Sequence, residues 1–306
     1  MKKIKLQAKL SDKKLQQTLG QFAEKKHYDQ VIDEDCNCYD VYGRPVLFLR
    51  KNYIDGPVLY DAYKNLEKAA TPTSNRTASS GGDRKNTINQ LGQKTKSLQV
   101  YDKKTGKVVK DRSGIVGYYD RSGHYNFCRT TAFTIYQKEK FEKAMPLIET
   151  VDRGFKEIVP DRYKKQKGMV LATDPNYRIG DTAFSTITVN KDYRTAFHTD
   201  QGDYPEGFGN LVAYCKDIEP VFLVLPKFKV AVNLNTNDLL LVDVHQIHGN
   251  TKIIKKSPNG VRLSFVMYYR NNMFKCLSPK EELKRIQRIQ RGLGQRIIAG
   301  EFSADF

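Results

Sequence analysis

Two histidines and one carboxylate occur at spacings that suit a single metal ion. His198 and Asp200 form an H-x-D pair in RTAFHTDQGD, and residues i and i+2 of an extended chain point to the same side. The segment DVHQIHGN offers a third nitrogen ligand in either His245 or His248. Two histidines and one carboxylate make the facial triad of non-haem iron(II) oxygenases, which leaves positions open for a cosubstrate and O2. The spacing therefore predicts an iron(II) site of this kind.

An arginine downstream of these residues suits an anionic cosubstrate. Arg262 begins the apolar strand RLSFVMYY, fourteen residues after His248. An arginine that projects into an apolar interior needs a carboxylate partner, and its planar guanidinium binds a carboxylate through two parallel hydrogen bonds. The distal carboxylate of 2-oxoglutarate meets this requirement. The sequence leaves open the alternative that a structural Asp or Glu pairs with Arg262.

The metal-binding segments lie within a series of predicted strands. Five β-branched or aromatic segments follow one another without an intervening helix, separated by Pro, Gly and Asn. They are residues 185–189, 221–225, 230–234, 239–244 and 263–269. Such a series predicts an antiparallel jelly roll. The expected fold class is α+β: a double-stranded β-helix (jelly-roll) core of antiparallel strands, braced by helices, with N- and C-terminal extensions.

Apolar patterns before this series predict further elements. Residues 137–156 follow a helical period, and we expect this helix to brace the sheet. Pro146 lies inside the pattern, so the helix is expected to kink or restart there. Nearer the N-terminus, residues 46–49 and 57–60 are predicted as strands and residues 62–68 as a short helix.

The chain is strongly basic, with a formal net charge of +18 and a pI near 9.5. Such an excess favours a nucleic-acid partner, because Lys and Arg neutralise phosphates. The alternative is that the charge only keeps the protein dispersed. The sequence SPKE at 278–281 predicts a capping box that starts a basic amphipathic helix, for which a DNA contact and a solvated face are both open readings.

Cysteine usage and hydropathy predict the cellular setting. The chain has five cysteines at irregular spacing, no run of 18 apolar residues, and no apolar segment after its charged first residues. These features predict reduced thiols, no contact with membranes, and a cytoplasmic or nuclear, intracellular location.

Three long segments resemble the TET/JBP family of iron(II)- and 2-oxoglutarate-dependent dioxygenases, which oxidise thymine or 5-methylcytosine in DNA. They are FSTITVNKDYRTAFHTDQGDYPEGFGNL, FLVLPKFKVAVNLNTNDLLLVDVHQIHGNTKI and VRLSFVMYYRNNM. Upstream, SNRTASSGG, GIVGYYDRSGHYNFCRTTAF and IVPDRYKKQ resemble the same group, so the similarity runs from about Thr73 to Met273. It is greatest to the short phage and viral members, which implies action in a host cell.

The resemblance assigns roles by position. It implies that His198, Asp200 and His248 are the iron ligands and that Arg262 anchors 2-oxoglutarate. It also selects His248 as the third ligand, because the family ligand lies just before G-N-T or a related triplet. By the same reasoning His245 becomes a residue that lies behind the ligands.

Contacts with the substrate are predicted less directly. Asp203 occupies the place where family members carry a base-contacting Asn or Asp, and a carboxylate there can accept from cytosine N4 or thymine N3. Asn190 is a candidate substrate contact, and Arg194 a candidate contact to the cosubstrate or a phosphate. Asn75 and Arg76 precede Ser-Ser-Gly-Gly and suit a backbone that approaches phosphate, although a solvated loop explains them equally well.

The resemblance divides the chain and predicts its reaction. We expect a single catalytic domain, with residues 1–67 as an N-terminal extension packed on the core, 68–100 as a polar basic loop, 101–276 as the jelly-roll dioxygenase domain and 277–306 as a C-terminal basic helix. The expected reaction oxidises the 5-methyl group of thymine or 5-methylcytosine in DNA to 5-hydroxymethyl or beyond. A base inside a duplex must be flipped out to reach a buried metal.

Two other functions remain open at this level. One is a 2-oxoglutarate-dependent hydroxylase of RNA, a nucleoside, a protein or a small molecule. The other is a DNA-binding module without catalysis. The sequence does not choose between the two methylated pyrimidines.

Overall fold

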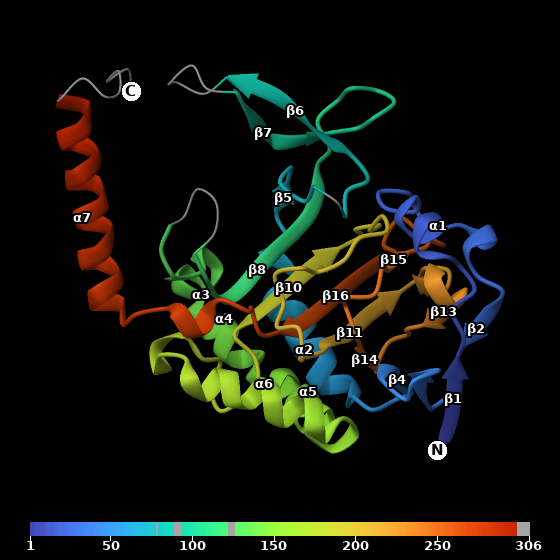
Figure 1. Cartoon of the computed structure of the whole chain (residues 1–306). Helices are drawn as coiled ribbons and strands as arrows, with labels where there is room; N and C mark the ends of the chain where they lie inside the picture. Colours follow the sequence, from blue (N-terminus) through green and yellow to red (C-terminus); the bar gives the residue numbers. More distant parts are fainter. Residues whose placement is uncertain (78, 89–93, 122–125, 299–306) are drawn as a thin grey trace.

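The computed structural model describes residues 1–77, 79–88, 94–121 and 126–298 of the chain (Figure 1). Parts of three predictions lie outside these residues, namely positions 78 and 89–93 of the polar loop, 122–125 of an upstream motif, and 299–306 of the C-terminal helix. Within the described part, no helix is both long enough and apolar enough to cross a bilayer.

Two β-sheets form the framework of the fold. The strands of the large sheet are β1 (Lys2–Leu6), β3 (Cys36–Asp40), β4 (Pro45–Arg50), β5 (Pro72–Thr73), β8 (Asp111–Tyr119), β9 (Arg129–Thr130), β10 (Thr186–Lys191), β11 (Gly209–Lys216), β14 (Leu239–Val242) and β16 (Val261–Tyr268). Those of the small sheet are β2 (Gln30–Ile32), β12 (Phe222–Leu225), β13 (Val230–Asn233) and β15 (Gly249–Asn250). The large sheet has the order β1-β3-β4-β14-β11-β16-β10-β8-β5, with β9 paired to β8, and the small sheet has the order β15-β12-β13-β2.

Pairing within the sheets is almost entirely antiparallel. Among the strands described, only the pairs β1–β3 and β13–β2 are parallel. The predicted strands correspond to β10, β12, β13, β14 and β16 to within two residues at each end. The α+β jelly-roll fold class is therefore confirmed.

Apolar side chains of both sheets form a core between them. Leu240 of the large sheet belongs to the same buried cluster as Leu225 and Val232 of the small sheet. Because successive side chains of a strand point to opposite faces, Phe48 and Leu241 belong instead to a second core on the other side of the large sheet. Both faces of the large sheet are thus covered, which explains why its central strands are continuously apolar.

Helices cover that second face. Helices α2 (Gly56–Leu66), α5 (Met145–Ile158) and α6 (Pro160–Ala172) lie together on one side of the sheet in Figure 1. Phe155 of α5 shares the second core with Phe265 of β16. The other helices are α1 (Asp12–Gln16), α3 (Ala132–Tyr136), α4 (Lys138–Lys143) and α7 (Pro279–Ile298), with single 3-10 turns η1 (Lys25–His27), η2 (Glu67–Ala69), η3 (Pro175–Tyr177), η4 (Pro226–Phe228) and η5 (Met273–Lys275).

Two predicted helix boundaries are confirmed. Helix α4 ends at Lys143 and α5 begins at Met145, so Pro146 lies in a first turn, where its missing N–H costs no hydrogen bond. At the start of α7, the Glu281 carboxylate accepts hydrogen bonds from the backbone N–H of Ser278 at 3.1 Å and from its hydroxyl at 2.6 Å.

The strand predicted at residues 57–60 is wrong, whereas the helix predicted at 62–68 is confirmed, although it starts earlier and its last residues lie in η2. A single helix, α2, runs from Gly56 to Leu66, with Leu59, Ala62 and Leu66 buried along one side. Their spacing of three and four residues is helical, but an apolar run of four residues does not distinguish a strand from a helix.

The polar basic loop predicted at residues 68–100 contains regular structure. It includes β5 and the two strands of a hairpin, β6 (Asp83–Ile88) and β7 (Lys94–Tyr101), which form a sheet of their own. These strands carry few apolar side chains, so no alternation of apolar and polar residues revealed them.

The prediction that all thiols are reduced is also wrong. Cys128 and Cys276 form a disulfide, with their Cα atoms 5.7 Å apart. The two residues are separated by 148 positions, and only the packing of the segment before α7 against the segment before β9 brings them together. The remaining cysteines are free, and Cys36 and Cys38 are buried in β3.

A pair of glycine substitutions tests the packing of β8 against η2. An ideal Cβ at Gly114 would lie 1.8 Å from the Ala69 carbonyl oxygen, whereas one at Gly168 in α6 would meet no atom within 4 Å. We expect Gly114→Ala to lower the free energy of unfolding by about 3 kcal/mol, because backbone must move to admit the methyl group. Gly168→Ala, the control, is expected to raise it by about 0.5–1 kcal/mol. Urea unfolding followed by circular dichroism measures both, and a neutral Gly114→Ala would contradict this packing.

Candidate metal and cosubstrate site

The segment after β10 and the segment before β15 are joined at the candidate metal site. His198 and His248 exchange two backbone hydrogen bonds, each with an N–O distance of 3.0 Å. The Asp200 backbone N–H donates to the Val244 carbonyl at 3.1 Å. These bonds place three side chains from two distant stretches of sequence beside one another.

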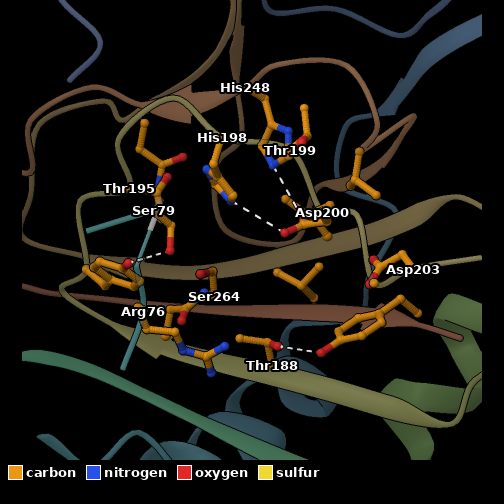
Figure 2. A pocket seen from close by; sticks show the side chains of 18 of the residues that line it. Arg76, Ser79, Thr188, Thr195, His198, Thr199, Asp200, Asp203, His248 and Ser264 are labelled. Carbon is orange, nitrogen blue, oxygen red and sulfur yellow. Dashed lines mark hydrogen bonds and ion pairs between the residues drawn. The ribbon is translucent and has the colours of Figure 1, made fainter. Parts of the chain in front are cut away.

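The ligand atoms of the three side chains converge (Figure 2). The Nε2 atom of His198 lies 3.6 Å from Asp200 Oδ1, and that of His248 lies 3.7 Å from Asp200 Oδ2. All the candidate ligand atoms lie within 4.8 Å of one another, and this is the only such group of three or more His, Cys, Asp or Glu among the residues searched, which are the described ones. A single ion between them would be within reach of all three.

Backbone carbonyls fix the tautomer of both histidines. Nδ1 of His198 lies 2.8 Å from the Ala196 carbonyl oxygen, and Nδ1 of His248 lies 2.9 Å from that of Gln246. A carbonyl only accepts, so each Nδ1 carries the hydrogen and each Nε2 keeps a lone pair for the metal. Burial, together with the nearby His198 ring, lowers the pKa of His248 to about 4. Its imidazole is therefore neutral at neutral pH, as a metal ligand must be.

Arg262 lies in the wall of the same cavity without a carboxylate partner. The cavity has a volume of about 220 Å³ and is lined by all three candidate ligands and by Arg262, which is only 4% exposed. Its Nε atom has no hydrogen-bond partner, and no ion pair involves it among the described residues. Asp192 accepts a hydrogen bond from the backbone N–H of Arg262 at 2.8 Å, not from its side chain. Burial lowers the pKa of the guanidinium, against the opposing effects of Cys215 and Asp192.

A buried guanidinium of this kind is costly unless an anion pairs with it. The distal carboxylate of 2-oxoglutarate would supply that anion, with its other end free to reach the metal ligands in the same cavity. The residues present therefore fit both an iron(II) ion and this cosubstrate, whereas no structural Asp or Glu takes the place of the cosubstrate within the described chain.

Alternate residues of β16 line the cavity. Arg262, Ser264, Val266 and Tyr268 all face it, while the residues between them are buried in the core beneath the helices. Thr188 on β10 faces the cavity as well and exchanges a hydrogen bond of 3.0 Å with the Tyr268 hydroxyl. The two-residue period of a strand that contains Arg262 was a signal from which Ser264 and Tyr268 could have been predicted.

Two further ionisable side chains, Asp203 and Arg270, line the cavity. Burial and the nearby Asp200 raise the pKa of Asp203 well above its usual value. Arg270, which the sequence reasoning missed, donates from Nε to Asp120 at 2.7 Å and lies over the Tyr119 ring, 4.0 Å from its centroid. Its two Nη groups make no hydrogen bond within the described residues, and Arg270 lines the cavity.

The structure brings most of the predicted site residues to this cavity. Its lining includes His198, Asp200, Asp203, His248, Arg262, Asn190 and Arg76. Asn190 accepts a hydrogen bond from the Ser113 hydroxyl at 2.6 Å.

Three predicted site residues do not line the cavity. Arg194 donates to the Ala23 carbonyl at 2.8 Å and lies over the Phe22 ring. Asn75 accepts from the Thr73 hydroxyl at 2.8 Å. His245 lies behind the wall, with Nδ1 3.2 Å from Asp243 Oδ1 and Nε2 3.4 Å from the Asp203 carbonyl oxygen.

Comparison with protein families shows which family contains a chain with this site. The family model Tet_JBP, described as the oxygenase domain of the 2OGFeDO superfamily, matches residues 114–271. The chain belongs to this family. Tet_JBP oxygenases use iron(II), 2-oxoglutarate and O2, so this chain does too, and the matched residues contain the entire candidate triad and Arg262.

Curated relatives of the Tet_JBP domain are much longer than this chain. Bifunctional helicase and thymine dioxygenase JBP2 of Leishmania tarentolae is 34% identical over 179 residues, which are 58% of this chain and 16% of the relative. Thymine dioxygenase JBP1 of Trypanosoma brucei brucei is 37% identical over 166 residues, which are 53% of this chain and 19% of the relative. The chain therefore spans less than a fifth of either relative. These relatives do not test the predicted similarity to phage and viral members.

A solved structure shares the fold of this Tet_JBP chain. NgTET1 in complex with 5mC DNA superposes with a TM-score of 0.51, covering 91% of this chain and all of that chain, at 14% sequence identity. At this identity the likeness supports the jelly-roll fold alone.

Arg262 variants test the cosubstrate site separately from the metal site. We expect Arg262→Leu to weaken 2-oxoglutarate binding by about 100-fold or more, because a buried ion pair is lost, while Mn²⁺ affinity stays at the wild-type value. His198→Ala is expected to weaken both, since the cosubstrate chelates the metal. Anaerobic titration calorimetry with Mn²⁺ and then 2-oxoglutarate measures each affinity. If Arg262→Leu bound 2-oxoglutarate with unchanged affinity, the prediction that Arg262 binds the cosubstrate would be wrong.

Proposed function

We propose that this chain oxidises the 5-methyl group of a pyrimidine base in DNA. His198, Asp200 and His248 hold iron(II), and Arg262 anchors 2-oxoglutarate. The observation that carries the proposal is the buried guanidinium of Arg262, unpaired with any described acid and sharing a cavity with the three ligands. When bound, iron and 2-oxoglutarate together with O2 supply the oxidising power needed for an unactivated C–H bond.

The residues of the chain contribute binding, orientation and exclusion of water. The carbonyls of Ala196 and Gln246 hold both imidazoles in the tautomer that presents Nε2 to the metal. Apolar side chains of Leu223, Val244 and Val266 line the cavity and limit the water beside the reacting atoms. The protein thus supplies a fixed geometry, while the cosubstrate supplies the chemistry.

Two features support DNA as the substrate. The net charge of +18 favours a polyanion, and the relatives named above are thymine dioxygenases by name. A cavity of about 220 Å³ does not admit a duplex, so the target base must leave the stack, which costs a few kcal/mol. Phosphate contacts beside the cavity, for example by Arg76, would offset that cost.

Thymine is the base that the cavity wall favours. A carboxyl at Asp203 pairs with the edge of either pyrimidine, so it does not choose between them. The Nη groups of Arg270 are donors only and lack partners among the described residues. They complement the O4 carbonyl of thymine and would oppose the N4 amine of 5-methylcytosine.

We further infer the domain organisation and setting. Residues 101–276 would form the dioxygenase domain, with residues 1–67, 68–100 and 277–306 as elaborations of it. The enzyme would act inside a cell, where its DNA substrate lies. A phage or viral source stays a prediction.

A competition between two DNAs tests the substrate and the base together. The protein, loaded with iron(II) and 2-oxoglutarate, is mixed in air with oligonucleotides in which either thymine or 5-methylcytosine is the only methylated base. We expect 5-hydroxymethyluracil as the main product, because Arg270 donates to O4. In Arg270→Gln, which offers both a donor and an acceptor, the preference for thymine should fall by roughly 10-fold, about 1.4 kcal/mol of discrimination.

The matched control is Arg270→Lys, which remains a donor only and is expected to keep the preference. Digestion and mass spectrometry of the nucleosides give the products. Oxidation of 5-methylcytosine alone would reject the proposed role of Arg270, and succinate formation with neither DNA changed would move the substrate to RNA, a nucleoside, a protein or a small molecule.

A further inference from the structure

None of the described side chains of the β6–β7 hairpin belongs to a hydrophobic core cluster. Its two strands form a separate two-stranded sheet, and five of the six residues of β6 are exposed, including Ile88 at 69%. A lone hairpin is at best marginally stable in water. Figure 1 shows this one projecting beyond the two main sheets, which suggests that a partner covers it during function.

The hairpin is strongly basic. Its described strands carry Arg84, Lys85, Lys94 and Lys96 against the single acid Asp83. Asp83 pairs with Lys103 at 3.6 Å, outside the hairpin strands, so it neutralises none of the four. No ion pair involves these four cations within the described part of the chain. The surface is complementary to a polyanion.

The base of the hairpin is joined to the wall of the cavity. The Val100 backbone N–H donates to the Ser74 carbonyl at 2.8 Å, which attaches β7 to the segment before β6. Ser79 of that segment lines the cavity. Its carbonyl accepts from the Ala196 N–H at 2.8 Å, and its hydroxyl accepts from the Tyr193 hydroxyl at 2.7 Å.

Glycine permits the close approach at this junction. A Cβ at Gly82 would lie 2.5 Å from the Tyr101 carbonyl oxygen, and Gly81 has φ of +66°. The segment that leads into the hairpin is therefore hydrogen-bonded to Ala196, which lies two residues before the candidate ligand His198. A partner bound by the hairpin is therefore held near the cavity that a flipped base would enter.

We propose that the β6–β7 hairpin is an arm that lies in a groove of duplex DNA beside the flipped base. A two-stranded ribbon fits the major groove, and the four cations of the arm would contact phosphates along it. This inference rests on the proposed function for the identity of the partner. Contacts between the arm and the phosphates would increase the affinity for DNA independently of its sequence.

Neutralisation of three lysines tests the arm. In the triple variant Lys85→Gln, Lys94→Gln, Lys96→Gln, we expect duplex affinity to fall by about 10-fold or more at moderate salt. The slope of log K against log salt concentration should become shallower by about 0.9 for each lost phosphate contact. Fluorescence anisotropy of a labelled duplex measures both, without any requirement for turnover. 2-Oxoglutarate affinity is expected to be unchanged, which also reports that the variant folds.

The control removes the same charge from the helical face. Lys143, Lys156 and Lys164 lie exposed on α4, α5 and α6, across the large sheet from the cavity, and no ion pair involves them in the described structure. Their triple replacement by Gln is expected to leave the salt slope at the wild-type value. An equal loss of duplex affinity in both triple variants, or a wild-type salt slope in the hairpin triple variant, would contradict the proposal that the hairpin binds DNA.

Amide hydrogen exchange provides a second and independent readout. Addition of duplex is expected to slow exchange in β6 and β7 of the wild-type protein, and unchanged exchange there would reject the arm. If duplex binding depends on the hairpin but no DNA base is oxidised, the arm stands and the proposed reaction fails. If bases are oxidised while the hairpin triple binds normally, the reaction stands and the arm fails.

Discussion

The pair of backbone hydrogen bonds between His198 and His248 is the constraint on which the site depends. These bonds join the segment that leaves β10 to the segment that enters β15, and so connect the large sheet to the small one at the candidate metal ligands. Side chains alone would not hold three ligand atoms within 4.8 Å, because each would lose several rotamers without compensation. Here the backbone fixes the ligands, and the carbonyls two residues before each histidine fix the rings.

One face of β16 contributes to the stability of the fold, and the other face contributes residues to the candidate site. One face contributes Phe265 and its neighbours to the core beneath the helices, while the other presents Arg262 to the cavity. A charged guanidinium buried in this way destabilises the unliganded protein unless an anion arrives. That cost becomes a source of affinity when a carboxylate pairs with it, so the fold and the cosubstrate are energetically linked.

The sequence was sufficient for the parts of the site that local pattern encodes. Residue type and spacing predicted His198, Asp200, a third ligand at either His245 or His248, and Arg262 as candidate site residues, and the series of apolar strands predicted the jelly roll. Family resemblance was needed to choose His248 over His245. The two-residue period of a strand, counted from Arg262, would also have predicted that Ser264 and Tyr268 line the cavity.

Features that depend on distant contacts escaped prediction for physical reasons. Arg270 reaches the cavity wall because Asp120, 150 residues away, holds its Nε, and no local pattern reports that pairing. The disulfide between Cys128 and Cys276 is equally non-local. The hairpin was predicted to be a loop because its strands carry few apolar residues, and residues 57–60 were predicted to be a strand because a run of four apolar residues does not distinguish a strand from a helix.

The central claim is that one cavity binds the metal through His198, Asp200 and His248 and binds the cosubstrate through Arg262. A crystal structure of the protein grown without O2, with Mn²⁺ in place of iron(II) and with 2-oxoglutarate, tests it most directly. We expect one anomalous peak bonded to the three side chains, a chelating cosubstrate, and its distal carboxylate on the guanidinium of Arg262. A metal bound elsewhere, or a cosubstrate whose distal carboxylate does not contact Arg262, would contradict the account.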